Sequence, residues 1–278
     1  MQQRELTWRP EARELNMRTP RIHVPEVTIS GEVLTVSGQA AHHVTQVLRL
    51  RPGSLIRLFN GQGGEWDAVL LACRRSEISL EVRNSVATIA ESALSITLVQ
   101  GIARNDRMDF ILQKSVELGV ARIQPLWMQR SQARSRRERH EKHTMRWQGI
   151  IINACEQCGR TTLPELCCPE DFTTWLERQN SGTHGIMLQP DSTRSLHDIP
   201  PPAGDIIVLV GPEGGLSPEE QELAAASGFI GIRMGQRILR TETAALSALA
   251  GMQTLWGDFS GPIQAATHCD YDSEPEIA

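Results

Sequence analysis

The stretch "VLVGPEGGLSPEE" (residues 208–220) predicts a strand, a glycine-rich loop and a helix in immediate succession. Its first three residues are apolar and rich in β-branched side chains, which suits a buried strand. Ser217 is a good helix N-cap, Pro218 suits the first helical position, and Glu220 completes a capping box. In α/β proteins a strand–loop–helix unit of this kind builds a binding site at the carboxyl end of a sheet. We therefore predict an α/β domain with a ligand site at this loop.

The glycine loop, residues 211–215, lacks the features of a phosphate-binding loop. "GPEGG" matches neither of the two common phosphate-loop patterns, has no Lys, and places Glu213 where an anion would be repelled. The loop therefore favours a neutral or cationic ligand, or it is a tight turn that binds nothing. A second expected strand, residues 231–234, also runs into a glycine, Gly235. Two such loops at neighbouring strand ends favour one shared pocket.

Hydrophobic patterning predicts that strands and helices alternate from about residue 94 onward. Residues 94–102 and 120–128 suit strands, and residues 106–119 between them suit a helix. A strand–helix–strand unit implies a parallel sheet. A long helix follows, with an apolar stripe from Trp147 to Cys158. Further strands are expected over residues 185–190, 206–210 and 231–234, and a final apolar helix after residue 240.

Residues 21–90 predict a smaller, β-rich module. "LIRLFNGQGGEWDAVLL" (55–71) places an Asn-Gly turn signal between two strand-like runs, which is typical of a hairpin. "ISLEV" alternates as a further strand, and "AHHVTQVLRL" (41–50) is a short helical piece. The predicted organisation has four parts. They are a flexible N-terminal extension (1–20), the β-rich module (21–90), the α/β domain (91–260) and a flexible acidic tail (261–278).

Composition and cysteine content limit the class of protein. The 278 residues are 40% hydrophobic and 22% charged, which is ordinary for a soluble globular protein. The sequence shows no apolar run long enough to span a membrane and no charged-then-apolar leader. The six Cys, together with the lack of an export signal, favour a reducing compartment. We expect a soluble, cytoplasmic protein without a membrane partner.

The net charge of −5 is unevenly distributed along the chain. Residues 101–147 hold 11 basic and 5 acidic residues, whereas residues 148–260 hold 6 basic and 14 acidic residues. The basic run "RSQARSRRERHEKHTMRW" (130–147) is the densest part. It is either a solvated helix face or an electrostatic footprint for RNA phosphates, and the run alone does not decide between them.

The cysteine spacing resembles a zinc site, but the surrounding pattern does not favour one. "CEQC" (155–158) has a common ligand spacing, yet its Cys fall on an apolar helical stripe. The adjacent Cys167 and Cys168 make poor ligand geometry. We therefore expect thiols buried in the core and no metal site. Glu156 and Arg160, which follow the same helix, have the spacing of an ordinary surface ion pair.

Six stretches resemble one family of enzymes, and they occur in that family's order. They are "RIHVP", "HHVTQVLRLRPGSLIRLFNGQGGEW", "RMDFILQKSVELGVARIQPL", "RWQGIIINACEQCGR", "LVGPEGGLSPEE" and "MGQRILRTETAALSAL". They extend from about residue 21 to residue 256, and "GPEGG" is shared with a wider superfamily. By these stretches the chain resembles the RsmE family of small-subunit ribosomal RNA methyltransferases, within the SPOUT superfamily of knotted methyltransferases.

The resemblance implies a fold, a reaction and partners. The fold is a trefoil-knotted α/β methyltransferase domain behind an N-terminal β-barrel PUA-like RNA-binding domain. The reaction is transfer of a methyl group from S-adenosylmethionine to N3 of a specific uridine in 16S rRNA of the assembled small ribosomal subunit. The partners are that subunit and a second copy of the chain, in a homodimer. Two alternatives stay open: a related enzyme with another RNA target, such as a ribose 2′-oxygen, and a non-catalytic ribosome assembly factor.

S-adenosylmethionine has a sulfonium cation and an adenine but no phosphate, so its pocket needs close backbone approach rather than a Lys. The resemblance assigns to this pocket Leu188, Gly211, Pro212, Glu213, Gly214, Gly215, Met234, Gly235, Ile238, Leu239, Arg240, Thr241 and Thr243.

Uracil N3 carries a proton at neutral pH, so the site must stabilise the N3 anion or accept that proton. The candidates for these roles are Arg21, Arg104, Arg160, Arg240 and Glu242. The RNA phosphates would be bound by basic side chains of both predicted domains. The expected RNA-binding residues are Arg21, His43, Arg49, Arg51, Arg130, Arg134, Arg136, Arg137 and Arg139.

Overall fold

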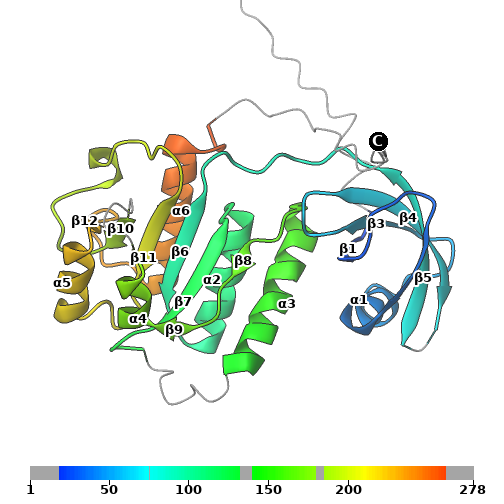
Figure 1. Cartoon of the computed structure of the whole chain (residues 1–278), viewed down its shortest axis with the longest axis horizontal. Helices are drawn as coiled ribbons and strands as arrows, with labels where there is room; N and C mark the ends of the chain where they lie inside the picture. Colours follow the sequence, from blue (N-terminus) through cyan, green and yellow to red (C-terminus); the bar gives the residue numbers. More distant parts are fainter. Residues whose placement is uncertain (1–18, 75, 132–139, 180–184, 261–278) are drawn as a thin grey trace, which may run out of the picture. The chain divides into compact units, whose positions relative to one another are not determined.

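The computed structural model describes residues 19–74, 76–131, 140–179 and 185–260 (Figure 1). These residues form two compact units, which divide between Thr88 and Ile89. Unit 1 comprises the described residues up to Thr88, and unit 2 those from Ile89 onward. The expected acidic tail and nearly all of the expected N-terminal extension lie outside the described residues.

Unit 1 is a curled sheet of five strands in the order β1-β3-β4-β5-β2 (Figure 1). The strands are β1 (Arg21–His23), β2 (Val33–Ser37), β3 (Leu55–Phe59), β4 (Glu65–Cys73) and β5 (Glu77–Ser85). β1 pairs in parallel with β3, and the other neighbours are antiparallel. Helix α1 (Gly38–His42) and a π-helical turn (His43–Val47) connect β2 to β3 and bury Ala41 and Val44 in the core of the unit.

The β3–β4 hairpin confirms the turn expected from the Asn-Gly signal. The Asn60 side-chain oxygen accepts from the backbone N–H groups of Gln62 at 2.8 Å and Gly64 at 3.0 Å. A short polar side chain thereby takes the place of a backbone carbonyl in the turn. On β4 the alternation places Trp66, Ala68 and Leu70 on the buried face of the sheet.

Unit 2 contains a sheet in which all paired strands are parallel, as the strand–helix alternation predicted. The strand order is β12-β10-β11-β6-β7-β8, and β9 also pairs with β7. The strands are β6 (Ile96–Gly101), β7 (Arg122–Trp127), β8 (Glu165–Leu166), β9 (Glu170–Asp171), β10 (Gly185–Leu188), β11 (Ile206–Val210) and β12 (Ile230–Ile232). The expected strand over residues 231–234 is shifted, because β12 begins at Ile230 and ends at Ile232.

Five α-helices of unit 2 cover the two faces of this sheet. They are α2 (Asn105–Glu117), α3 (His140–Cys158), α4 (Phe172–Glu177), α5 (Pro218–Ala226) and α6 (Thr241–Trp256), with a 3-10 turn at Leu196–Asp198. Side chains alternate across each strand, so Val99 and Leu209 face the core cluster that α4 and α5 share. Helix α6 packs on β6 and β11 and against α2, and α2 packs against α3. The result is a three-layered α/β unit.

The helices run back across the sheet, which gives its two edges different neighbours. Thr241 at the start of α6 bonds to Gly211 just after β11, at the carboxyl edge of the strands. Gln253 near the end of α6 bonds to Leu118, just before β7, at the amino edge. The starts of α5 and α6 therefore lie at the carboxyl edge, where α/β proteins bind ligands.

Within the described ranges, every helix is too short or too polar to cross a membrane.

Candidate functional site

The loop between β11 and α5 is fixed at its helical end by a capping box. The Ser217 hydroxyl oxygen accepts from the Glu220 backbone N–H at 3.2 Å, and a Glu220 carboxylate oxygen accepts from the Ser217 backbone N–H at 2.8 Å. The other carboxylate oxygen of Glu220 accepts from the Gln129 backbone N–H at 2.7 Å. These bonds satisfy N–H groups that a helix start leaves without partners. They confirm the expected capping box and also tie the loop to the segment after β7.

Close backbone packing shapes the same loop. A Cβ atom at Gly211 would lie 2.7 Å from backbone atoms of Gly215 and Leu216, so glycine is required for the loop to turn back on itself. A Cβ atom at Gly214 would lie 2.9 Å from the Arg130 side chain. The Arg130 guanidinium donates to the carbonyl oxygens of Gly214 at 2.9 Å and Leu216 at 3.2 Å. Arg130 therefore holds the loop with both its stem and its charged group.

The second glycine loop runs from the end of β12 to the start of α6. Gly235 in this loop has a φ of +78°, a conformation that glycine adopts without strain. Thr241, the first residue of α6, donates its hydroxyl hydrogen to the Gly211 carbonyl oxygen at 2.6 Å. The start of α6 therefore lies against the end of β11, which brings the two glycine loops together.

A pocket of about 300 Å³ lies between the two loops, at the carboxyl ends of β10, β11 and β12. This volume is at the lower end of the range for small-molecule sites. Of the thirteen residues expected to bind a cofactor, eleven line the pocket: Leu188, Gly211, Pro212, Glu213, Gly214, Gly215, Met234, Gly235, Ile238, Leu239 and Thr241. The other two, Arg240 and Thr243, are exposed beside it.

Nine further lining residues were not expected from the sequence: Arg130, Gln189, Pro190, Val210, Leu216, Gln221, Ile232, Arg237 and Ala244. Val210 and Ile232 end their strands, and Gln221 lies in the first turns of α5, so strand ends and helix starts would have pointed to them. Arg130 had no such signal, since it lies 84 residues before Gly214, to which it bonds.

The lining of the pocket offers flat apolar contact and charges of both signs, since Arg130 and Arg237 line it beside Glu213. Leu188, Ile232 and Leu239 contribute aliphatic side chains, and the glycines leave backbone polar groups within reach. Among the described lining residues, Glu213 is the one carboxylate. Its Oε1 accepts from the Arg104 backbone N–H at 2.8 Å, while its buried Oε2 has no hydrogen-bond partner among the described residues. A buried acceptor without a donor is costly, so it favours a ligand that supplies one or that carries positive charge.

Three of the five candidates for the chemical step lie at helix starts that border this pocket. Arg104 is the N-cap residue of α2, and its backbone is bonded to Glu213. Arg240 is the N-cap residue of α6 and is exposed. Glu242 lies in the first turn of α6, where its Oε2 is buried without a partner among the described residues.

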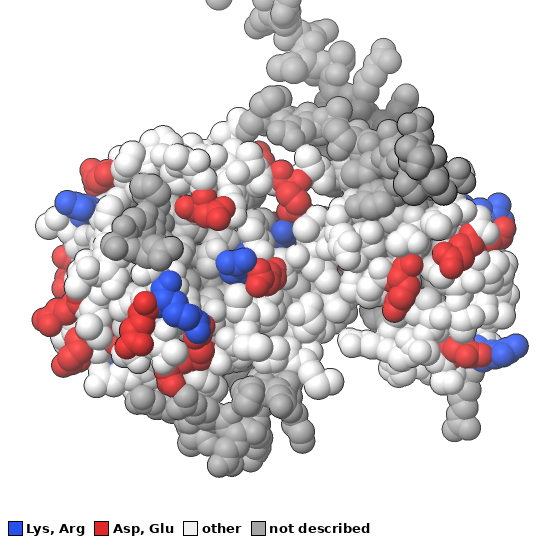
Figure 2. Space-filling view, in the orientation of Figure 1, with Lys and Arg blue, Asp and Glu red and all other residues white. Residues whose placement is uncertain are grey.

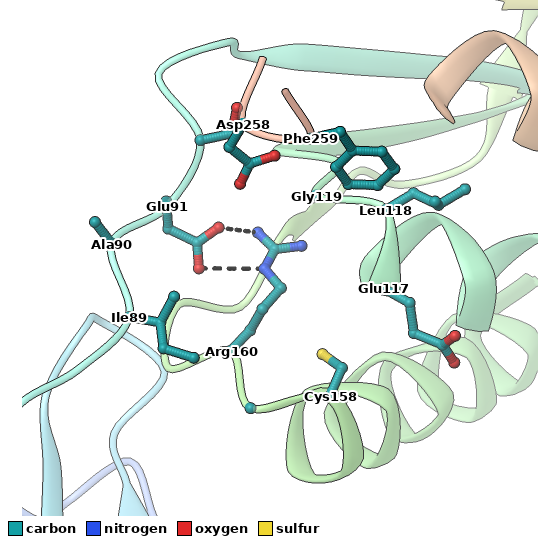
Figure 3. Close-up of a pocket in the computed structure, with 12 residues that line it drawn as sticks. Ile89, Ala90, Glu91, Glu117, Leu118, Gly119, Cys158, Arg160, Asp258 and Phe259 are labelled. Atoms are coloured by element: carbon teal, nitrogen blue, oxygen red, sulfur yellow. Dashed lines mark hydrogen bonds and ion pairs between the residues drawn. The ribbon is translucent and has the colours of Figure 1, made fainter. Parts of the chain in front are cut away.

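Arg160 lies at the opposite edge of the sheet. Figure 3 shows its guanidinium facing the Glu91 carboxylate, with N–O distances of 3.2 and 2.8 Å. Its Nη1 also donates to the carbonyl oxygens of Val116 at 3.0 Å and Val120 at 2.9 Å, just before β7. Arg160 and Glu91 line a cavity of about 100 Å³ at the amino edge. Within one chain the structure therefore does not bring Arg160 to the glycine-loop pocket.

Arg21, the remaining candidate, lies on β1 in unit 1. Its Nε donates to Glu65 at 2.6 Å, and its guanidinium lies 4.8 Å from the centre of the Phe59 ring. The nearby Arg57 lies 4.0 Å from the same carboxylate. Glu65 is buried, so these cations offset the cost of keeping its charge away from water.

The expected RNA-binding residues fall into three groups. Arg49 and Arg51 are exposed on unit 1, and Arg49 has a φ of +53°, which is uncommon for a residue other than glycine. His43 in the same unit is half-buried. Arg130 is exposed but holds the glycine loop of unit 2, as described above. Arg134, Arg136, Arg137 and Arg139 lie outside the described residues.

Acidic side chains gather over α5 on the face of unit 2 seen in Figure 2. Glu219 and Glu222 on this helix are exposed. Hydrogen bonds from the Glu219 backbone N–H and the Ser217 hydroxyl hold the pKa of the Glu219 carboxyl below its usual value. This part of the surface is therefore negative at neutral pH and would repel RNA phosphates.

The cysteines are less uniformly buried than the sequence suggested. Cys155 on α3 is buried and Cys158 is half-buried, but Cys168 is exposed, so the expectation of core thiols is wrong for Cys168. In the part of the chain that the structure describes, no group of three or more His, Cys, Asp or Glu side chains could hold a metal ion.

Comparisons with known proteins agree on one family. An RNA methyltransferase domain matches residues 90–253, and an RNA methyltransferase PUA domain matches residues 36–82. Ribosomal RNA small subunit methyltransferase E of Buchnera aphidicola (subspecies Acyrthosiphon pisum) is 32% identical over 88% of this chain and 96% of its own length.

Two solved structures are also similar. The crystal structure of ribosomal RNA small subunit methyltransferase E from Neisseria gonorrhoeae, bound to S-adenosylmethionine, is 41% identical with a TM-score of 0.81, and it covers 87% of this chain and 100% of that one. A methyltransferase from Legionella pneumophila, also bound to S-adenosylmethionine, is 37% identical with a TM-score of 0.83 and the same coverage of both chains.

Proposed function

This chain belongs to the ribosomal RNA small subunit methyltransferase E family, and we propose that it transfers a methyl group from S-adenosylmethionine to N3 of one uridine in 16S rRNA. The observation that carries this proposal is the pocket between the two glycine loops, which is lined by loop backbone and aliphatic side chains together with Glu213, Arg130 and Arg237. The alternative of a tight turn that binds nothing does not account for a second loop that completes the same pocket.

The residues of the pocket fit S-adenosylmethionine. The close packing at Gly211 leaves backbone N–H and C=O groups to read an adenine edge, and Leu188, Ile232 and Leu239 provide flat apolar contact. The buried Oε2 of Glu213 provides an acceptor for a donor group of the ligand, while the Arg107 guanidinium lies 3.8 Å from the other oxygen of this carboxylate. When bound, S-adenosylmethionine supplies a methyl group on a sulfonium, which departs as a neutral thioether, so the reaction needs no metal ion.

The residues of this chain then have to act on the imino group of the uridine. N3 becomes a useful nucleophile only as its proton leaves. Arg104 and Arg240, at the helix starts beside the pocket, would favour the developing anion electrostatically. Glu242 is the proposed proton acceptor, since its buried Oε2 has no partner among the described residues. Arg160 is omitted from this set because its guanidinium holds Glu91 and two carbonyl groups at the other edge of the sheet.

RNA binding is proposed for unit 1 and for the basic segment that follows Arg130. The exposed Arg49 and Arg51 support a phosphate-binding role for unit 1, and the PUA match covers both. The target uridine would leave its stack to reach the pocket. We place the PUA-like domain at residues 21–90 and the methyltransferase domain at residues 91–260.

A trefoil knot and a homodimer complete the proposal. β12 is an edge strand, yet the chain returns from it to the end of β11, where Thr241 bonds to Gly211, so residues 233–240 pass beside the first glycine loop. This path supports the knot.

The homodimer is supported by the exposed apolar side chains of Leu255 and Phe259 at the end of α6, which would lie in a surface that a second copy covers. A ribosomal substrate places the proposed reaction in the cytoplasm.

The test uses small ribosomal subunits from cells that lack this gene. The subunits, or the naked rRNA, are incubated with purified protein and methyl-labelled S-adenosylmethionine, and the labelled nucleoside is identified by mass spectrometry. Label in 3-methyluridine from assembled subunits, at a higher rate than from naked RNA, is the expected result. Label in a ribose-methylated nucleoside would show that the enzyme methylates a ribose 2′-oxygen instead of uridine N3. Subunit binding without label would favour an assembly factor. A Gly211→Ala variant, which we expect not to bind the cofactor, serves as the negative control.

A further inference from the structure

Gln100 is a buried polar residue at the carboxyl end of the central strand β6, where its neighbours Leu98 and Val99 are apolar. It is 0% exposed and does not line the glycine-loop pocket. Its amide Nε2 donates to the Gly101 carbonyl oxygen at 2.9 Å and to the Thr241 hydroxyl oxygen at 3.0 Å. The same nitrogen lies 3.4 Å from the Gly211 carbonyl oxygen.

These bonds join three segments that are far apart in the sequence. Thr241 accepts from Gln100 and donates to Gly211 at 2.6 Å, so one hydroxyl links β6, the first glycine loop and α6. The Gly211 carbonyl accepts from the Thr241 hydroxyl, and the Gln100 Nε2 makes a longer, weaker contact with the same oxygen. β6 also packs tightly against this loop, since a Cβ atom at Gly101 would lie 2.5 Å from the Pro212 ring.

Stability alone gives a glutamine little advantage at this position. The Oε1 atom of Gln100 is buried without a partner among the described residues, and such an unmade bond costs about 1–3 kcal/mol. A leucine of similar volume would remove this cost but also the bonds from Nε2 to Gly101 and Thr241, so the two effects on stability largely offset each other. Gln253 is a useful contrast. It is equally buried, at the other edge of the sheet, and both ends of its amide are bonded, to Ser92 and to Leu118.

We propose that Gln100 is a positioning residue for the cofactor: through Thr241 and Gly211 it fixes the two glycine loops relative to each other. The inference rests on the proposed function, because the loops it joins form the proposed S-adenosylmethionine pocket. Without the amide, the Gly211 carbonyl keeps only the bond from Thr241, and the Thr241 hydroxyl loses the donor that orients it. The bound cofactor would then have to order the loops itself, which weakens its binding.

The test compares Gln100→Leu with Gln253→Leu in the full-length protein. The dissociation constant of S-adenosylmethionine is measured by titration calorimetry well below the melting temperature, together with the melting temperature, KM and kcat. For Gln100→Leu we expect a rise of about tenfold or more in the dissociation constant and in KM, little change in kcat at saturating cofactor, and a melting temperature close to that of the wild type. For Gln253→Leu we expect a lower melting temperature and unchanged cofactor affinity.

Two further variants keep the test decisive if Gln100→Leu folds poorly. Thr241→Val removes the hydroxyl at nearly constant shape, and Thr241→Ser retains it, so the Val variant should bind the cofactor more weakly than the Ser variant. Because Gln100 acts through Thr241, Gln100→Leu should add little to Thr241→Val. Cofactor affinity within twofold of wild type for Gln100→Leu, or full additivity of the two changes, would overturn the proposal. Failure of the wild-type protein itself to bind S-adenosylmethionine would instead refute the proposed function and this inference with it.

Discussion

Replacing Arg130 by Met should weaken cofactor binding and leave RNA binding nearly intact. The sequence favoured Arg130 as an RNA contact, but its guanidinium donates to the Gly214 and Leu216 carbonyl oxygens at 2.9 and 3.2 Å. Met keeps an apolar stem against Gly214 and removes both bonds. Two hydrogen bonds from a partly exposed cation contribute about 1–2 kcal/mol in total, which corresponds to a rise of roughly 5- to 30-fold in the dissociation constant of S-adenosylmethionine.

The assay measures two affinities for the same protein preparations. Cofactor affinity is measured by titration calorimetry, and affinity for small ribosomal subunits is measured at several salt concentrations. Arg122→Met is the matched control, because Arg122 carries the same charge but pairs with Glu165 at the amino edge of the sheet. If Arg130 instead binds a phosphate, the Arg130 variant would keep its cofactor affinity, lose subunit affinity, and show a salt dependence reduced by about one counterion. That result would refute the assignment of Arg130 to the loop.

Two other substitutions test the site and its support, and a labelling experiment tests the environment of Cys167. Gly211→Ala places a methyl group 2.7 Å from the loop's own backbone and should abolish detectable cofactor binding by calorimetry; retention of wild-type affinity would show that the loop can move aside. Glu220→Ala leaves the backbone N–H groups of Ser217 and Gln129 without acceptors, so unfolding should become easier by about 2–4 kcal/mol, a fall of roughly 5–15 °C in melting temperature by calorimetry. A fall of less than about 1 °C would argue against the capping box. Burial raises the pKa of the Cys167 thiol to about 11, so the thiol is protonated at pH 8 and iodoacetamide should modify it slowly, at a rate that rises with pH up to that value. Rapid labelling at pH 8, detected by peptide mass spectrometry, would contradict this.

The structural elements that the sequence predicts correctly are those whose signal lies within a few residues of chain. The strand–loop–helix unit around residues 208–220 has the expected bounds, because apolar β-branched residues favour β11 and the reciprocal bonds of Ser217 and Glu220 begin α5. Asn60 likewise forms the expected turn with its own side chain. In each case the deciding interaction is made within a few residues of chain.

The missed elements are short or weakly patterned. Helix α4 (Phe172–Glu177) has six residues, and β8 and β9 have two each, too few for a periodic pattern to appear. Their formation depends on pairing with β7 and on packing of Phe172 and Trp175 into the core cluster beneath the sheet. Tertiary contacts therefore create these elements.

The sequence did not predict at which edge of the sheet Arg160 lies. Arg160 was a candidate because an Arg beside the base would stabilise the N3 anion, but a helix that connects parallel strands runs back across the sheet and ends at the amino edge. The pocket lies at the carboxyl edge, so a residue just after the end of such a helix lies far from it within the same chain.

Apart from the short elements α4, β8 and β9, the sequence by itself determined which segments form strands and helices, and which two loops carry glycine, since these features depend on neighbouring residues. It also carried the stretches that identify the family. Only the tertiary structure decided which distant residues meet at and behind the pocket. Arg104 and Glu213 are 109 residues apart, and Gln100 and Thr241 are 141 apart. Such contacts depend on the order β12-β10-β11-β6-β7-β8 of the parallel sheet, which brings distant strand ends to one edge, and no local pattern encodes that order.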